Sequence, residues 1–143
     1  MIPKGEGYLL VRAAGRRVGL ALAQVVEVLD PGPTYPVPAV EPAVRGVTTV
    51  RGRIVPVIHL GALLEGTACP DARGDVAIVV ELAGRTLCLE VEEAETVLRE
   101  PGFAVPPGAA LAWAVAVART DEGLVPLLDL TALGARIKED PAA

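Results

Sequence analysis

The chain has 143 residues and is 52% hydrophobic but only 3% aromatic, so a single compact domain would have to build its core from aliphatic side chains. Its formal net charge of −5 argues against nucleic-acid binding, which needs a basic surface, and against anionic membrane surfaces. The sequence has neither a secretory signal nor a run suited to a membrane helix, so we expect a cytoplasmic protein without membrane insertion.

The first half of the sequence predicts short strands separated by turns. Ala14-Gly15 and Arg51-Gly52 are typical of hairpin turns, because glycine readily adopts positive φ. Residues 23–29 fit either a helical turn or a strand, and the proline-rich residues 30–38 fit a loop. The expected regular elements are, in order, strands at 8–12, 18–22, 46–51 and 53–58 and a helical turn at 59–64.

The second half repeats this plan about seventy residues later. Residues 9–29 and 78–98 are identical at 7 of 21 aligned positions, and residues 54–60 are echoed by 124–130. The elements expected here are strands at 76–82, 86–91, 111–118 and 124–128, residues 92–98 in the place of 23–29, and a helix at 129–138. A unit of this length present twice is not a solenoid, so we expect two copies of a small β-rich fold packed together.

Residues that carry catalysis are scarce. His59 is the only histidine, serine is absent, and no phosphate-binding or dinucleotide motif is present. Cys69 and Cys88 lack metal-ligand spacing, and Cys88 falls at the repeat position of Gly19, which favours a place in the core. The acidic run Glu90, Glu92, Glu93 and Glu95 is most simply a solvated face. We therefore expect a protein that is not an enzyme and that uses no metal or cofactor.

Residues 45–60, RGVTTVRGRIVPVIHL, resemble the signature of the CheW family of chemosensory coupling proteins. The resemblance extends over nearly the whole chain. It implies a mainly β fold of two packed five-stranded SH3-like β-barrels, related by the internal repeat and accompanied by short helices. On this basis we expect a single domain with a first lobe at 7–64, a linker at 65–74, a second lobe at 75–128 and a carboxyl-terminal helix at 129–138.

The resemblance also implies a function and two partners. Members of the family are non-catalytic adaptors that join the cytoplasmic tip of a chemoreceptor to the regulatory domain of a CheA-type histidine kinase. The implied receptor-binding residues, in a groove between the lobes, are Val25, Glu27, Val28, Gly46, Thr49, Arg51 and Gly52. Arg51 is physically the best supported, because a turn arginine offers a rigid fork of donors. The resemblance does not specify which residues contact the kinase.

The sequence departs from the family pattern at two positions, and it is also compatible with two other functions. His59 stands where the family usually has Asp, and since His is a weak helix cap we expect either a weaker helix after it or a different neighbour for its side chain. Thr49 stands where Asn is common, and Trp113 fits either a core anchor or an interface residue. The alternatives are an adaptor of a pilus or twitching-motility pathway, or a small-ligand-binding β-barrel, which would need a pocket with convergent polar groups.

Overall fold

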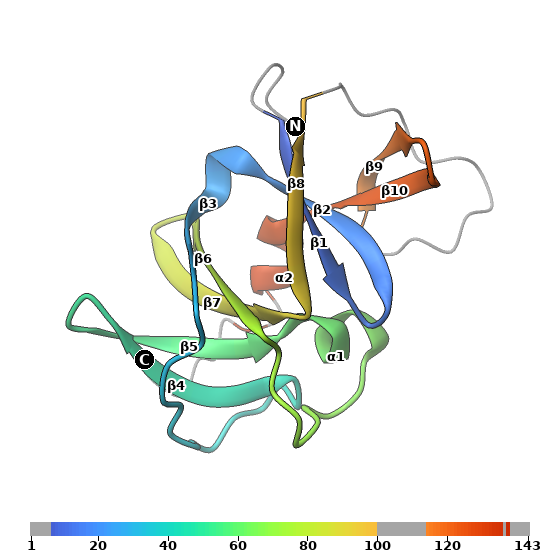
Figure 1. Cartoon of the computed structure of the whole chain (residues 1–143). Coiled ribbons are helices and arrows are strands. Elements are labelled where there is room, and N and C mark those ends of the chain that lie inside the picture. The colour runs from blue at the N-terminus through green and yellow to red at the C-terminus, as the bar shows by residue number, and fades with distance from the viewer. Residues whose placement is uncertain (1–6, 100–113, 136, 138–143) are drawn as a thin grey trace.

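The computed structural model describes residues 7–99, 114–135 and 137. Within these residues the chain forms two five-stranded sheets and three short helical segments (Figure 1). The strands are β1 (Tyr8–Ala13), β2 (Arg16–Ala21), β3 (Val25–Leu29), β4 (Val44–Val50), β5 (Arg53–His59), β6 (Val76–Leu82), β7 (Arg85–Val91), β8 (Glu93–Leu98), β9 (Ala114–Thr120) and β10 (Gly123–Leu128). The helical segments are the 3-10 turn η1 (Leu22–Gln24), α1 (Leu60–Glu65) and α2 (Leu130–Ala135).

The predicted hairpin turns are present where the sequence placed them. Their two central residues both have positive φ, as a two-residue turn matching the strand twist requires. The turns are Ala14-Gly15, Arg51-Gly52 and Ala83-Gly84. The ambiguous residues 23–29 combine both interpretations, because η1 is followed directly by β3. Of the strand expected at 111–118, β9 begins at Ala114, and residue Trp113 lies outside the described residues.

The sheets reveal an exchange of hairpins between the two halves of the sequence. We define sheet A by the strand order β8-β1-β2-β10-β9 and sheet B by the order β3-β6-β7-β5-β4. Each sheet takes a hairpin from one half of the chain and three strands from the other. The lobes predicted at 7–64 and 75–128 therefore do not correspond to the sheets, because a strand pattern does not specify which copy of a repeat supplies the pairing partner.

The repeat is nevertheless visible in the strand pairing. In sheet A, β2 and β10 are parallel and Gly19 pairs with Leu127. In sheet B, β7 and β5 are parallel, and the equivalent Cys88 pairs with Val57. This parallel pairing begins immediately after Pro56, which lacks a backbone donor, while β5 still pairs with β4 through Pro56. Despite its proline, β5 is thus an inner strand of sheet B.

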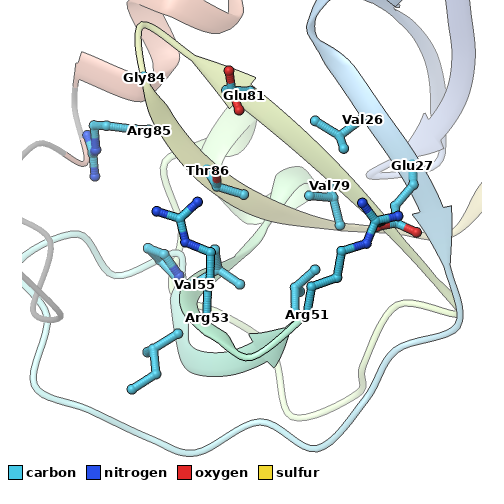
Figure 2. A pocket seen from close by; sticks show the side chains of 13 residues that line it. Val26, Glu27, Arg51, Arg53, Val55, Val79, Glu81, Gly84, Arg85 and Thr86 are labelled. Carbon is cyan, nitrogen blue, oxygen red and sulfur yellow. Dashed lines mark ion pairs between the residues drawn. The ribbon is translucent and has the colours of Figure 1, made fainter.

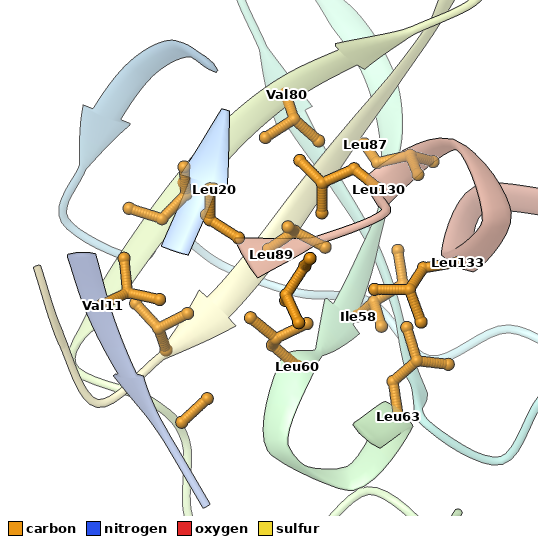
Figure 3. Packing of buried hydrophobic residues seen from close by; sticks show 14 of the residues in the cluster. Val11, Leu20, Ile58, Leu60, Leu63, Val80, Leu87, Leu89, Leu130 and Leu133 are labelled. Atoms are coloured by element: carbon orange, nitrogen blue, oxygen red, sulfur yellow. The ribbon is translucent and has the colours of Figure 1, made fainter. Parts of the chain in front are cut away.

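A single large apolar core joins the two sheets. Alternate residues of sheet A, such as Val11 and Leu20, face alternate residues of sheet B, such as Val80 and Leu89 (Figure 3). Leucines of α1 and α2 complete this shared core. Cys88 belongs to a small separate cluster on the other face of sheet B, and its burial raises the pKa of its thiol to about 11. The prediction that Cys88 is a core residue is confirmed.

Both α-helices begin with the same kind of side-chain cap. The Nδ1 atom of His59 accepts a hydrogen bond from the backbone N–H of Ala62 at 3.0 Å. Asp129 Oδ1 accepts from the backbone N–H of Ala132 at 3.0 Å. Both expectations for His59, a poorly capped helix and a different neighbour for its side chain, were wrong, since a neutral imidazole nitrogen supplies the acceptor that the helix start lacks.

Candidate protein-interaction surface

Sheet B carries a cleft of about 640 Å³ on the face opposite the shared core. Successive side chains of a strand point to opposite faces, so Ile78 and Val80 of β6 enter the shared core while Val79 and Glu81 line the cleft. Figure 2 shows how β3, the β4–β5 hairpin and the β6–β7 hairpin surround it. Its lining residues are Val26, Glu27, Val50, Arg51, Arg53, Ile54, Val55, Pro56, Val79, Glu81, Gly84, Arg85 and Thr86.

Arg51 and Glu27, two of the predicted site residues, form an ion pair beside this cleft (Figure 2). The distance from Arg51 Nη2 to Glu27 Oε1 is 2.9 Å, and the arginine side chain is 71% exposed while the glutamate is partly buried. Glu27 lies on β3, an edge strand, whereas Arg51 lies at the turn joining β4 to β5 on the other side of sheet B. The pair therefore connects the two sides of the curled sheet. An exposed ion pair contributes only about 0–1 kcal/mol to stability.

Apolar side chains surround the ion pair and remain accessible. Ile54 on β5 is 67% exposed and Val26 on β3 is 47% exposed, and both line the cleft. Arg53 is also exposed and forms no ion pair with any residue that the structure describes. Exposed aliphatic groups next to a free guanidinium form a surface suited to a partner with both apolar and acidic groups.

Sequence reasoning missed Arg53, Ile54 and Val26. The repeat contained a usable indication of Ile54, because Leu124 follows a turn at the equivalent position of β10 and is also exposed. In both copies this aliphatic residue follows a polar turn and lies outside the shared core, which would have indicated a role at the surface. Nothing comparable pointed to Arg53, whose repeat position is occupied by Gly123.

The other predicted site residues divide into accessible and structural positions. Val28 and Thr49 are exposed, and Thr49 pairs with Ile54 across the β4–β5 hairpin. Gly52 is exposed in the turn. Val25 is half-buried and packs against the shared core, so its side chain serves the fold more than the surface.

Gly46 is buried, and its lack of a side chain is required by the backbone. A Cβ atom there would collide with the main chain of Tyr35. Tyr35 and Val47 exchange two backbone hydrogen bonds of 2.8 and 2.9 Å, which hold the proline-rich loop against β4. Gly46 therefore permits this close approach and offers no contact surface. Arg51 and Glu27 line a cleft within sheet B to which both predicted lobes contribute, residues 26–56 from the first and 79–86 from the second.

A buried ion pair supports the base of the signature hairpin. Glu90 on β7 is only 1% exposed, and Arg45 on β4 binds it through both carboxylate oxygens, with distances of 2.7 and 2.8 Å. The backbone N–H of Gly74 donates to the same carboxylate at 3.0 Å. The hydrogen bonds with Glu90 raise the pKa of Arg45. Glu90 is thus part of the interior, and the prediction that it belongs to a solvated face was wrong.

A second charged cluster joins β8 to the β1–β2 hairpin. Glu95 accepts hydrogen bonds from Arg17 at 2.6 Å and from Arg12 at 3.1 Å. Glu92 accepts one from the backbone N–H of Gly15 at 2.8 Å. Of the predicted acidic face, Glu92 and Glu93 are exposed, while Glu95 is largely withdrawn from solvent. These contacts hold the edge strand β8 in place.

The described part of the chain contains no group of three or more histidine, cysteine or acidic side chains arranged to hold a metal ion. Within the same residues no helix is long and apolar enough to cross a membrane. What the described surface does present is the cleft of sheet B with its basic and apolar rim. That arrangement can bind a partner through shape, apolar contact and charge.

Comparison with known proteins connects this fold to one family. Residues 7–138 match the CheW-like domain. Among solved structures, the chain is similar to the scaffolding protein TtCheW from Thermoanaerobacter tengcongensis, with a TM-score of 0.77 and 22% sequence identity over 90% of this chain and 92% of that one. At this identity the likeness concerns the fold. A search of curated proteins finds no match.

Proposed function

We propose that this chain, which belongs to the CheW-like domain family of chemotaxis scaffolds, is a non-catalytic adaptor that couples chemoreceptors to a CheA-type histidine kinase. The observation that supports this most directly is the signature hairpin. It presents Arg51 in a rigid turn, held by Glu27 and flanked by exposed aliphatic side chains at a cleft. Such an adaptor performs no reaction, and its physical task is to hold two partners in a fixed geometry.

The receptor is proposed to bind at the β4–β5 hairpin and β3. A receptor signalling tip is a helical bundle, and one of its helices would place apolar residues against Ile54 and Val26. A carboxylate on that helix would bind the free donors of Arg51 or Arg53. Because Glu27 already orients Arg51, less side-chain entropy is lost when the partner binds.

The kinase regulatory domain is proposed to use sheet A, so that both partners bind simultaneously. The repeat places a second set of exposed aliphatic side chains on β8, β9 and β10, namely Val97, Val115 and Leu124. This set lies on the other sheet from the receptor surface. Two separate surfaces on one rigid core are what a coupling protein needs, since movement at one partner is then transmitted to the other.

The test is a pair of binding titrations with matched charge reversals. Arg51→Glu changes the cleft of sheet B, and Arg119→Glu makes the same charge change at an exposed position of β9 in sheet A. We expect Arg51→Glu to weaken binding of a receptor tip by about 10- to 100-fold, because a charge-assisted contact becomes a repulsion. Arg119→Glu should leave receptor binding within about twofold, and circular dichroism should show both variants folded.

Binding of the kinase regulatory domain completes the test. Arg51→Glu should leave its affinity unchanged, which separates the two surfaces. If neither partner binds the wild-type chain at tens of micromolar, where weak signalling contacts still register, the adaptor proposal is wrong. If the wild-type chain binds both partners, a panel of receptor tips from flagellar and pilus pathways distinguishes which pathway the adaptor serves.

A further inference from the structure

His59 occupies a position where its protonation state decides whether a helix is capped. Its backbone ends β5, and its Nδ1 atom accepts the hydrogen bond from Ala62 at the start of α1. An imidazole nitrogen accepts a hydrogen bond only while it carries no proton, whereas both nitrogens of the imidazolium are donors. Protonation at Nδ1 therefore turns the cap into two donors facing each other.

The repeat supplies an internal comparison. At the start of α2, Asp129 makes the equivalent bond to Ala132 with the same 3.0 Å distance. A carboxylate keeps its acceptor oxygens at all pH values above about 4, while histidine ordinarily titrates near pH 6.5. Two helices of one molecule thus have caps of equal geometry, and only one of them is made by a type of group that ordinarily titrates between pH 7.5 and pH 5.

The packing around α1 passes any loss of this cap to its neighbours. The first turn of α1 lies directly against the β1–β2 turn, where a Cβ atom on Gly61 would be 2.9 Å from the backbone nitrogen of Ala14. His59 also lines a cleft of about 320 Å³ between that turn and the linker before β6. This contact joins a hairpin of sheet A to a helix that follows a strand of sheet B.

The charged groups around His59 do not favour the imidazolium enough to offset its burial. The groups that face it are Glu90 on β7, Arg45 on β4, Glu92 after β7, Glu65 on α1, and the cleft residues Arg73 and Asp75. Glu90 is already bound by Arg45, so its charge is largely compensated. Partial burial, more than any of these charges, lowers the pKa of His59 below its ordinary value of 6.5.

We propose that His59 makes α1 a pH-sensitive element: in mild acid the imidazole loses its acceptor nitrogen, the first turn of α1 opens, and its contact with the β1–β2 turn loosens. The unfolded chain binds the proton at a higher pH than the folded chain, so stability falls as the pH decreases. The loss begins as the pH falls through 6.5 and is complete once it is below the folded-state pKa. The device acts on the junction of the sheets and is independent of the proposed partners.

Nuclear magnetic resonance tests the proposal directly, because His59 is the only histidine of the sequence and gives one set of imidazole signals. Nitrogen shifts at pH 7.5 should show a neutral ring with the proton on Nε2. Between pH 7.5 and 5.0, the protection factor of the Ala62 amide should fall by about 3- to 30-fold, the range expected when a helix cap is lost. The Ala132 amide, capped by Asp129, is the internal control and should not change.

The variant His59→Asp copies the cap of α2 and should keep Ala62 protection constant over the same range. The proposal is overturned if the neutral ring carries its proton on Nδ1, or if Ala62 and Ala132 protection respond equally to pH in the wild-type chain. Both readouts come from the wild-type protein, so they decide the question even if His59→Asp fails to fold.

Discussion

At the scale of single residues, a charged side chain in the interior needs hydrogen-bond partners that replace water. Glu90 is bound through both oxygens by Arg45 and through one by the backbone of Gly74, so both oxygens that burial removes from water have hydrogen-bond donors. The three elements involved are β7, β4 and the segment before β6. The pair thus fixes the base of the signature hairpin relative to the rest of sheet B.

Removing one partner of this pair should be costly. We expect Arg45→Ala to lower the free energy of unfolding by about 3 kcal/mol, because the buried carboxylate of Glu90 would lose both of its side-chain hydrogen bonds and keep only Arg73, 3.8 Å away, as a counter-charge. The control Arg53→Ala removes an exposed arginine of the neighbouring strand and should change stability by no more than about 0.5 kcal/mol. Urea denaturation at pH 7 measures both. Equal midpoints for the two variants would show that Glu90 does not depend on Arg45.

Gly46 and Gly52 provide a test of whether a signature glycine serves the fold or the surface. Gly46→Ala places a methyl group against the backbone of Tyr35, whereas around Gly52 the space is open and only its φ of 78° opposes a side chain. We expect Gly46→Ala to destabilise the protein more than Gly52→Ala, whose cost should be about 1–2 kcal/mol. Thermal unfolding measures the difference. A smaller effect at Gly46 would mean that the proline-rich loop moves away without loss.

At the scale of elements, the edge strand β8 depends on a charge cluster. The hydrogen bond from Arg17, and next to it that from Arg12, lowers the pKa of Glu95 below its ordinary value of 4.5. A carboxylate with a lowered pKa stabilises the folded state above that ordinary value. The stabilisation is lost as the pH falls through the folded-state pKa, because the unfolded chain takes up the proton first.

We therefore expect the free energy of unfolding of Glu95→Gln to depend less on pH below pH 4.5 than that of the wild-type chain. The wild-type chain should lose more stability than this variant between pH 5 and pH 3, and the variant should already be less stable at pH 6. Glu93→Gln, at an exposed position of the same strand, is the control and should follow the wild-type curve. Urea midpoints across the pH range give the comparison. If the urea midpoints of Glu95→Gln and of the wild-type chain change equally with pH, the charge cluster does not contribute to the loss of stability in acid.

Local elements were largely predictable from the sequence, and their pairing was not. Alanine-glycine turns and aliphatic runs correctly predicted the hairpins, because turn geometry and strand alternation are local properties. The exchange of hairpins between the halves depends on which distant strand each hairpin meets, and the two copies carry nearly the same pattern. The same limit applies to Glu90 and His59, whose roles depend on Arg45 and on the Ala62 amide rather than on their own type.

The candidate site was predicted in part for a similar reason. The resemblance identified Arg51 and Glu27 individually, and the structure brings them within 2.9 Å of each other across sheet B. Their ion pair could not be read from residues 24 positions apart without knowing the curl of the sheet. Val25 and Gly46 show another limit, because the resemblance does not tell a residue that packs against the interior from one that faces a partner.

At the scale of the whole molecule, the exchange of hairpins makes the two sheets mutually dependent. Leu20 and Leu89 occupy equivalent positions in the repeat, and both are buried in the one core between the sheets. Neither sheet can lose its inner face without exposing that of the other. The chain should therefore unfold as one cooperative unit despite containing two copies of the same fold.

Leu20→Ala in sheet A tests this dependence through a reporter in sheet B. The substitution should cost about 2–5 kcal/mol, the usual range for a leucine deleted from a close-packed core. Cys88 is buried in sheet B, so its reaction with a thiol reagent reports the opening of that sheet. In a Cys69→Ala background, Cys88 labelling should accelerate by the factor that corresponds to the loss of stability measured by circular dichroism. Leu89→Ala should give the same relation. If Leu20→Ala lowers the unfolding midpoint while Cys88 keeps its wild-type labelling rate, the two sheets open separately and the shared core does not couple them.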